Sequence, residues 1–262
     1  KKLVYKREGD KMEEKKKEQD MKDSLIGLAQ GEIVQRHGEA SSQILQAYKG
    51  IRVDHNGHLE DFHGRNLKQI SEYNLGDNPD VSRKQQSGFS AELIKESRDN
   101  KQAVINGESN RTRTTDGIGK TNDTQYDHVI VDENGNVQEG SGSQMKFLKS
   151  RTTKNGQTKY NVIDKLAKDT SWDRYDGPVD IPSDQYEGAV RYAKEEAEKL
   201  DKQAAALREQ GNIEKAKEIE EKAQRYRDAQ KRVRDSGISS TEALDARNNP
   251  EKFMAKEMLK SG

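Results

Sequence analysis

Residues 126–148, at the centre of the chain, contain two short runs in which polar and apolar positions alternate. The first run is YDHVIVD, which alternates after Asp127, and the second is SQMKFL, in which Gln144 and Lys146 share one face. Alternation with a period of two is typical of a half-buried strand, and DENGN between the runs is a strong turn signal. The pattern predicts two strands joined by a turn, whose polar residues surround one point.

Helical periodicity flanks this stretch. Apolar residues spaced as on a helix recur over residues 25–34 and again up to Tyr48. The segment GFSAELIKESRDNKQAVING predicts a further helix, with Ser87 or Ser90 as its N-cap and Asn106-Gly107 as its end. Beyond it lies the polar loop ESNRTRTTDGIGKTNDTQ. After the central stretch come a basic loop (KSRTTKNGQTKY), a short helix (NVIDKLAKD) and a short strand within GPVDIP.

The chain from residue 184 to residue 236 is helical by composition and period. Alanine, leucine and isoleucine recur at heptad-like spacing in two arms, and Gly211-Asn212 separates the arms. This pattern predicts an antiparallel helical hairpin. We interpret it as a spacer or as an arm that docks a protein partner or a second copy of the chain.

Composition limits the size of any single core. Charged residues make up 36% of the chain and hydrophobic residues 29%, so several small cores joined by solvated helices are expected. Basic and acidic residues both number 47, so a phosphate-binding surface would depend on local segregation of charge. The absence of cysteine excludes disulfides, zinc–thiolate sites and thiol catalysis. No stretch approaches the roughly 20 apolar residues of a membrane span.

These patterns predict an α+β protein in five segments. They are a charged arm (1–22), a mainly helical region (23–86), a small α/β core (87–183), the helical hairpin (184–236) and short C-terminal helices (237–262). The chain begins with Lys1 rather than methionine, which we interpret as a sign of processing or of a longer parent protein.

The predicted core runs as helix, loop, strand, turn, strand, loop, helix and strand. With Ala91-Glu92 on the helix, Asp127 opening one strand and Gln144-Met145-Lys146 on the next, it resembles the restriction-endonuclease-like PD-(D/E)xK nuclease superfamily. It is most similar to the Holliday-junction-resolvase branch. The resemblance covers residues 88–183 and neither flank. Gln144 stands where the family usually has an acid, so a relative that binds without cutting is an open alternative.

The resemblance implies phosphodiester hydrolysis, with DNA favoured over RNA. Asp127 would ligate Mg²⁺ or Mn²⁺, Glu92 would help directly or through water, and Gln144 would offer its amide oxygen. Lys146 would orient or deprotonate the attacking water and stabilise charge on the phosphate. Cations in the flanking loops would hold the nucleic-acid backbone: Arg111, Arg113, Lys120, Lys149, Arg151 and Lys154.

Two settings follow from these observations. A nuclease of this kind would act in the bacterial cytoplasm as a toxin, defence or mobile-element protein, with delivery from outside if it is a toxin domain. The alternative is a non-enzymatic interaction or nucleic-acid-binding protein, which would use the 184–236 hairpin and a degenerate nuclease fold.

Overall fold

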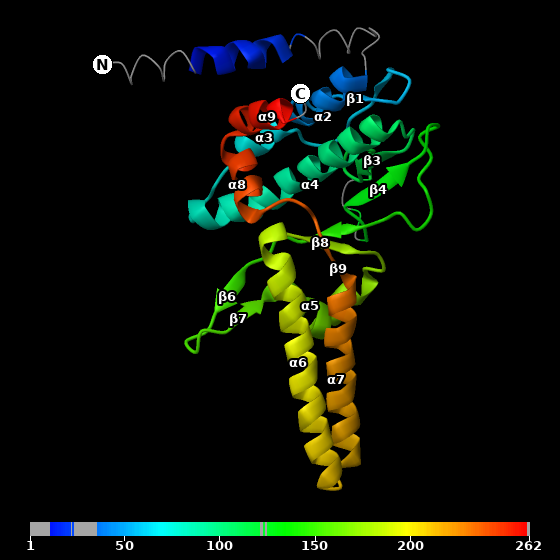
Figure 1. Ribbon diagram of the computed structural model, residues 1–262, viewed down its shortest axis with the longest axis vertical. Coiled ribbons are helices and arrows are strands. Elements are labelled where there is room, and N and C mark those ends of the chain that lie inside the picture. Colours follow the sequence, from blue (N-terminus) through cyan, green and yellow to red (C-terminus); the bar gives the residue numbers. More distant parts are fainter. Residues whose placement is uncertain (1–10, 22, 24–35, 121–122, 124, 261–262) are drawn as a thin grey trace, which may run out of the picture. The chain divides into compact units, whose positions relative to one another are not determined.

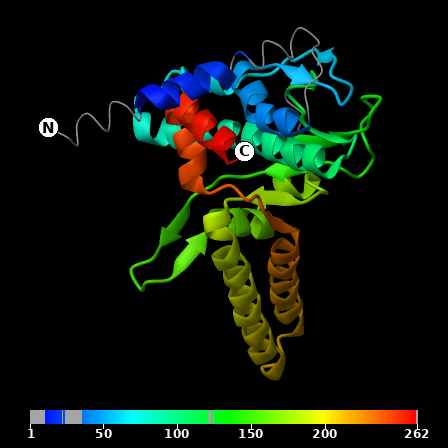
Figure 2. The ribbon, with the colours of Figure 1, turned by 45° about the horizontal axis from the view of Figure 1, so that its top comes forward.

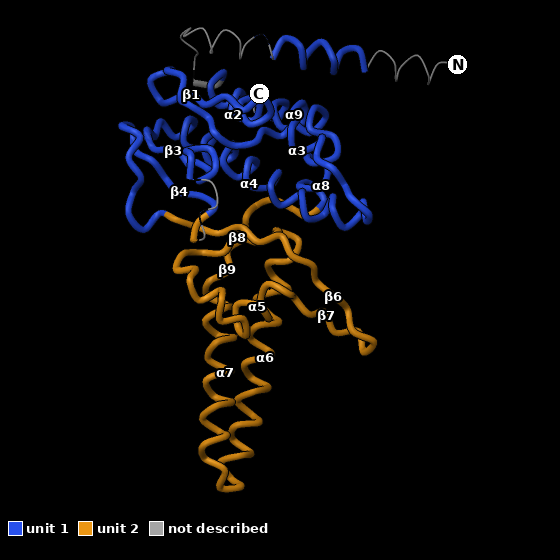
Figure 3. The backbone as a smooth tube through the Cα atoms, turned by 180° about the vertical axis from the view of Figure 1, so that it is seen from behind, with its two compact units in different colours: residues 1–123, 127–141, 241–262 blue, residues 124–126, 142–240 orange. Residues whose placement is uncertain are grey.

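A computed structural model describes residues 11–21, 23, 36–120, 123 and 125–260. The chain divides into two compact units, coloured blue and orange in Figure 3. Unit 1 comprises residues 1–123, 127–141 and 241–262, and unit 2 comprises residues 124–126 and 142–240. The α/β core predicted over 87–183 thus has residues in both units. The apolar stripe predicted over 25–34 lies outside the described residues.

Unit 1 is mainly helical and is built around one long helix, α4 (Pro79–Asn106). Its other elements are α2 (Arg36–Lys49), β1 (Arg52–Val53), β2 (Leu59–Glu60), α3 (Leu67–Ser71), β3 (Arg111–Thr114), β4 (His128–Val131), α8 (Ser240–Asn248) and α9 (Pro250–Leu259). In Figure 1, α2 and α3 lie close to α4 and α9 lies close to α2 and α3, and the contacts between these helices agree. Fully buried apolar side chains hold them together, among them Leu45, Leu67, Ile70, Ile94 and Met254.

Helix α4 begins earlier than the sequence pattern predicts. Asn78 is its N-cap, with a side chain that accepts a hydrogen bond from Val81 N at 3.4 Å, and Pro79 occupies the first turn, where its fixed φ suits a helix. The prediction that Ser87 or Ser90 caps this helix is therefore wrong, since both serines lie inside it. The predicted end is confirmed, because Gly107 adopts the left-handed conformation at the C-cap with φ of 70°.

The first strand of the central stretch has a different partner from the one predicted. Strand β4 pairs antiparallel with β3, in a register that joins Arg111 to Val131 and Thr114 to His128. The predicted hairpin between this strand and the strand of Gln144 is wrong. The RTRT sequence of β3 has no apolar residue and therefore predicts a polar loop, but its side chains have buried partners and the segment pairs with β4 as a strand. The DENGN turn is confirmed: Asp132 Oδ1 accepts from two backbone amides within it.

Unit 2 contains a parallel sheet of three short strands in the order β5 (Gln144–Met145), β8 (Val179–Ile181) and β9 (Val233–Asp235). Parallel neighbours require a crossover connection. Helix α5 (Asn161–Lys168) lies in the crossover from β5 to β8, followed by a short 3-10 helix, η1 (Thr170–Arg174). Between β5 and α5 lies an antiparallel hairpin of β6 (Ser150–Thr152) and β7 (Thr158–Tyr160). The region predicted as a basic loop is therefore largely a β-ribbon.

The crossover from β8 to β9 is the helical hairpin, formed by α6 (Ser183–Glu209) and α7 (Ile213–Arg232). Figures 1 and 2 both show the two helices side by side and antiparallel. Small buried residues form the seam between them: Ala193, Ala197, Ala204, Ala216 and Ala223. The final residues predicted as helix, VRD, instead form strand β9. Together the two units confirm the α+β class. None of the described helices has the length and apolarity that crossing a bilayer demands.

Candidate functional site

The four predicted catalytic residues fall into two pairs. Glu92 and Asp127 belong to unit 1, whereas Gln144 and Lys146 belong to unit 2.

Glu92 occupies the middle of α4 and not its first turn, so the helix dipole does not account for it. It lines a small cavity of about 10 Å³ together with Arg65, Thr114 and Asp116, a space that suits one water molecule. Asp127 immediately precedes β4, and its carbonyl oxygen accepts a hydrogen bond of 2.9 Å from the backbone of Thr115. Both carboxylate residues are half-buried, so each retains access to solvent.

The buried residue next to Asp127 connects these two elements. His128 is only 1% exposed, and its Nε2 donates a hydrogen bond of 2.8 Å to the carbonyl oxygen of Glu92. Burial lowers the pKa of His128, and the nearby charge of Lys95 lowers it further, so the ring is neutral at neutral pH. Asp127 therefore lies immediately before a strand that is tied to the helical turn carrying Glu92, an arrangement that the sequence reasoning missed.

Two of the cations predicted to hold nucleic acid lie in the interior of unit 1. Arg113 is 2% exposed and pairs with Glu60 at 3.1 Å and with Glu96 at 3.7 Å. Arg111 is 8% exposed, and its Nη1 donates to the carbonyl oxygen of Glu108 at 2.6 Å. The prediction that both arginines reach out from a polar loop is wrong, because both lie on β3 and their guanidinium groups are already satisfied.

The other predicted cations are exposed. Lys120 lies on the surface of unit 1, and Lys149, Arg151 and Lys154 lie on or beside the β6–β7 ribbon of unit 2. The sequence reasoning missed Lys159, which is on β7 directly opposite Arg151. The Asn155-Gly156 turn is the sequence signal that predicts the pairing of the two strands. That pairing would have placed Lys159 beside Arg151.

In unit 2 the predicted Gln-x-Lys segment opens the parallel sheet. The Gln144 amide donates to the carbonyl oxygen of Pro178, and the Lys146 amide donates to that of Asp180, both at 2.9 Å. Since strand residues alternate between faces, Gln144 and Lys146 share the face that carries Val179, the in-register partner of Gln144. Gln144 is 4% exposed. The backbone thus confirms a strand at Gln144 and places both polar side chains on one side of it.

Aromatic side chains surround the Lys146 amine. Its Nζ lies 3.2 Å from the hydroxyl of Tyr175, 4.9 Å from the centre of that ring and 5.0 Å from the centre of the Trp172 ring. The Tyr175 hydroxyl also accepts a hydrogen bond of 2.7 Å from Arg174. The arrangement fixes a lysine over two π faces, which attract its positive charge. The sequence reasoning missed these residues, although Trp172 is the only tryptophan of the chain.

Asp180, an acid of the same sheet, serves a different purpose. It pairs in register with Met145, so it lies on the face opposite Gln144 and Lys146. Its carboxylate is 1% exposed and accepts two hydrogen bonds from Arg234 of β9, at 2.6 and 2.9 Å. Asp180 therefore stabilises the β8–β9 ladder and does not replace the acid missing at Gln144.

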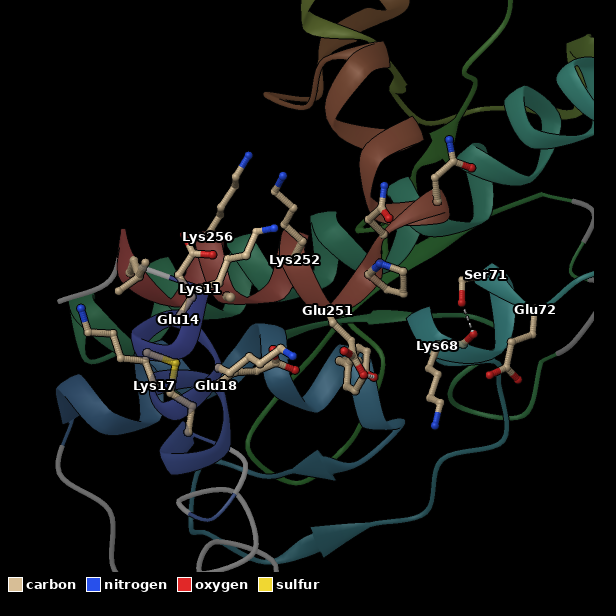
Figure 4. A pocket seen from close by; sticks show the side chains of 18 residues that line it. Lys11, Glu14, Lys17, Glu18, Lys68, Ser71, Glu72, Glu251, Lys252 and Lys256 are labelled. Carbon is tan, nitrogen blue, oxygen red and sulfur yellow. Dashed lines mark hydrogen bonds between the residues drawn. The ribbon is translucent and has the colours of Figure 1, made fainter. Parts of the chain in front are cut away.

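A cavity of about 570 Å³ in unit 1 contains none of the predicted site residues (Figure 4). Helix α9 and the helix at residues 11–21 line it, with six lysines and four glutamates among its walls. The hydroxyl of Tyr48 donates to Glu251 at 2.8 Å, and burial together with Glu251 and Glu18 raises the pKa of Tyr48. Because its charges are mixed in sign, the cavity does not select for an anion.

The described residues include no group of three or more histidine, aspartate or glutamate side chains placed to hold a metal ion. Mg²⁺ commonly keeps several waters and takes one or two protein carboxylates together with substrate phosphates. The half-buried carboxylates of Asp127 and Glu92 are donors of this kind. Comparison of the chain with protein-family models, with curated proteins and with solved structures found no match.

Proposed function

We propose that this chain is a metal-dependent nuclease that hydrolyses phosphodiester bonds in DNA, built on a restriction-endonuclease-like core. The observation that carries the proposal is the β5–α5–β8 crossover, in which Lys146 directly follows the β5 strand of Gln144 and its backbone amide continues the hydrogen bonding to β8. A strand with this motif followed by a helix and a parallel strand is what the PD-(D/E)xK resemblance implies.

The carboxylates of unit 1 support the same proposal. Asp127 immediately precedes β4, and His128 ties β4 to the helical turn of Glu92. These two acids would bind Mg²⁺ or Mn²⁺, which when bound polarises the phosphoryl oxygens. In unit 2, Gln144 offers a neutral amide oxygen, which attracts a cation less strongly than a carboxylate does.

Lys146 has the role of orienting the attacking water and of placing positive charge beside the phosphate. Trp172 and Tyr175 support this role, because they hold the long lysine side chain in one place. A group held in position before the reaction loses less entropy when the substrate binds.

Cleavage of supercoiled plasmid DNA tests the proposal. Wild-type protein should nick or linearise the plasmid with Mg²⁺ or Mn²⁺ and should be inactive in excess chelator. Asp127→Asn should abolish cleavage, while Asp201→Asn, at an exposed aspartate of α6 paired with Arg227, should leave it intact. Equal cleavage by wild type and Asp127→Asn would refute the proposal.

A second candidate is a non-enzymatic interaction protein, and the α6–α7 hairpin favours it. Alanines close its seam, its outer faces are exposed and charged, and ion pairs at 2.6 Å (Arg208–Glu220) and 2.7 Å (Arg227–Asp201) join the two arms. Replacing residues 204–224 by a short turn would remove the outer arm and keep the core residues Tyr192 and Tyr226. This candidate is supported if that variant no longer binds a protein partner or no longer forms a homodimer, and if wild type does not cleave DNA.

A further inference from the structure

The β6–β7 ribbon is the most one-sidedly charged element of unit 2. Residues 149–160 include four cationic residues and no acid. Figure 1 shows the ribbon extending to one side of α5 and α6. Its tip is a tight turn in which Thr153 N donates to Gln157 O at 2.8 Å, and Gly156 has φ of 80°, a conformation that glycine adopts at little cost.

The two faces of the ribbon differ in chemistry. Ser150 pairs with Tyr160, and the Tyr160 ring lies 5.9 Å from that of Tyr192 on α6. Arg151 pairs with Lys159 at the next position, so these cations lie on the opposite face. The basic face of the ribbon, defined by Arg151 and Lys159, is therefore turned away from α6.

Arg151 and Lys159 form a like-charge pair directly across the ladder, which destabilises a hairpin. Elsewhere in unit 2 a strand cation has an acid on the neighbouring strand, as Arg234 has Asp180. On the ribbon, by contrast, no acid among the described residues forms an ion pair with Lys149, Arg151, Lys154 or Lys159. Within the part of the chain that the structure describes, this positive charge is therefore left for a bound anion to neutralise.

We propose that the basic face of the β6–β7 ribbon binds duplex DNA, with the ribbon in the major groove and its cations on the flanking phosphates. The major groove of B-DNA, about 12 Å wide, admits a two-stranded β-ribbon, and here each strand carries a cation. The deep, narrow major groove of A-form RNA does not admit one. This inference rests on the proposed function only in taking DNA as the substrate.

Binding of a labelled DNA duplex to the full chain, measured by fluorescence anisotropy in chelator so that cleavage does not interfere, tests the inference. The double variant Arg151→Gln/Lys159→Gln should weaken binding about tenfold and reduce the slope of log Kd against log salt by about 1.8, since each phosphate contact contributes about 0.9. Lys194→Gln/Lys202→Gln is the matched control, because both lysines are exposed on α6 and the change in net charge is the same. The control should change affinity by less than about twofold.

The inference is overturned if the two double variants bind DNA equally, or if double-stranded RNA or polyglutamate binds the ribbon as well as duplex DNA does. Far-UV circular dichroism and the melting temperature show whether the ribbon variant is folded. If wild type cleaves DNA and the ribbon variant binds and cleaves it equally well, the ribbon inference is overturned and the nuclease proposal is retained. If DNA binding depends on the ribbon but wild type does not cleave DNA, the nuclease proposal is overturned and the ribbon inference is retained.

Discussion

The amine of Lys146 lies 3.2 Å from the hydroxyl of Tyr175, so the lysine of the Gln-x-Lys motif is held by a residue on the far side of the β5–β8 crossover. Tyr175→Phe keeps the ring and its attraction for the amine but removes the hydroxyl. We expect kcat for DNA cleavage to fall about 2- to 10-fold, as for loss of one hydrogen bond of about 0.5–1.5 kcal/mol, while KM is unchanged.

Tyr192→Phe is the control for this prediction, because it removes a hydroxyl from the same core, one that donates to Asp164 at 2.7 Å and does not contact Lys146. Steady-state kinetics of both variants check it. A Tyr175→Phe enzyme with the kcat of Tyr192→Phe would show that the hydroxyl does not position Lys146.

The buried carboxylate of Glu96 neutralises two arginines in unit 1. Its side chain and those of Arg52 and Arg113 are each at most 4% exposed. Glu96→Gln leaves the buried Arg52 without its carboxylate partner and Arg113 with Glu60 alone, and we expect it to lower the free energy of unfolding by about 3–5 kcal/mol. Urea denaturation measures this change. Glu220→Gln breaks a pair in which both side chains are 41% exposed, so solvent screens it and the loss of stability should be much smaller than for Glu96→Gln. Similar losses in both variants would contradict this view of Glu96.

His128 makes stability depend on pH. Its folded-state pKa is lowered by burial, so between that pKa and the unfolded value of about 6.5 the unfolded chain binds more protons. The contribution of His128 is therefore fully present above about pH 6.5 and is lost as the pH falls below it. His128→Gln should reduce proton uptake on unfolding at about pH 5 by up to one proton, measured as the pH slope of the unfolding free energy. An unchanged slope would be evidence against this role.

Two glycines should respond to alanine in opposite directions. A Cβ on Gly177 would lie 2.2 Å from the carbonyl oxygen of Gly142, where the chain enters β5 beside β8. Gly177→Ala should therefore destabilise unit 2 by about 1–3 kcal/mol. Gly88, inside α4, has open space around its Cβ position, and Gly88→Ala should stabilise by about 0.5–1 kcal/mol. Thermal unfolding of both variants checks the pair, and a shift of the same sign in both would contradict it.

The helices were predictable from the sequence where a face carries small apolar residues at a regular spacing. The hairpin arms and α5 are of this kind, and the crossover that joins β5 to β8 follows from the order of strand, helix and strand. The pairing of β3 with β4 was not predictable from period or propensity. RTRT has no apolar residue, and it is buried only because Glu60, Glu96 and Asn100 supply partners from distant segments.

The same limit applies to the candidate site. The motif residues could be named from the sequence, because their types and order resemble a known superfamily. The contacts that hold Lys146 come from Trp172 of η1 and from Tyr175 directly after it. Both follow Lys146 by more than twenty residues, and no pattern in their sequence indicates a contact with β5. Likewise, Lys159 becomes the partner of Arg151 only when the strand register is known.

Single-turnover cleavage of a labelled DNA duplex by wild type, Lys146→Met and Lys165→Met tests the nuclease proposal most directly. Lys165 is the matched control because its amine lies 5.8 Å from the centre of the same Trp172 ring. We expect wild type and Lys165→Met to cut with Mg²⁺ or Mn²⁺, and Lys146→Met to be slower by at least about 100-fold, as for loss of a general acid–base group. Equal rates for the two lysine variants, or no metal-dependent cleavage by wild type with either ion, would contradict the proposal.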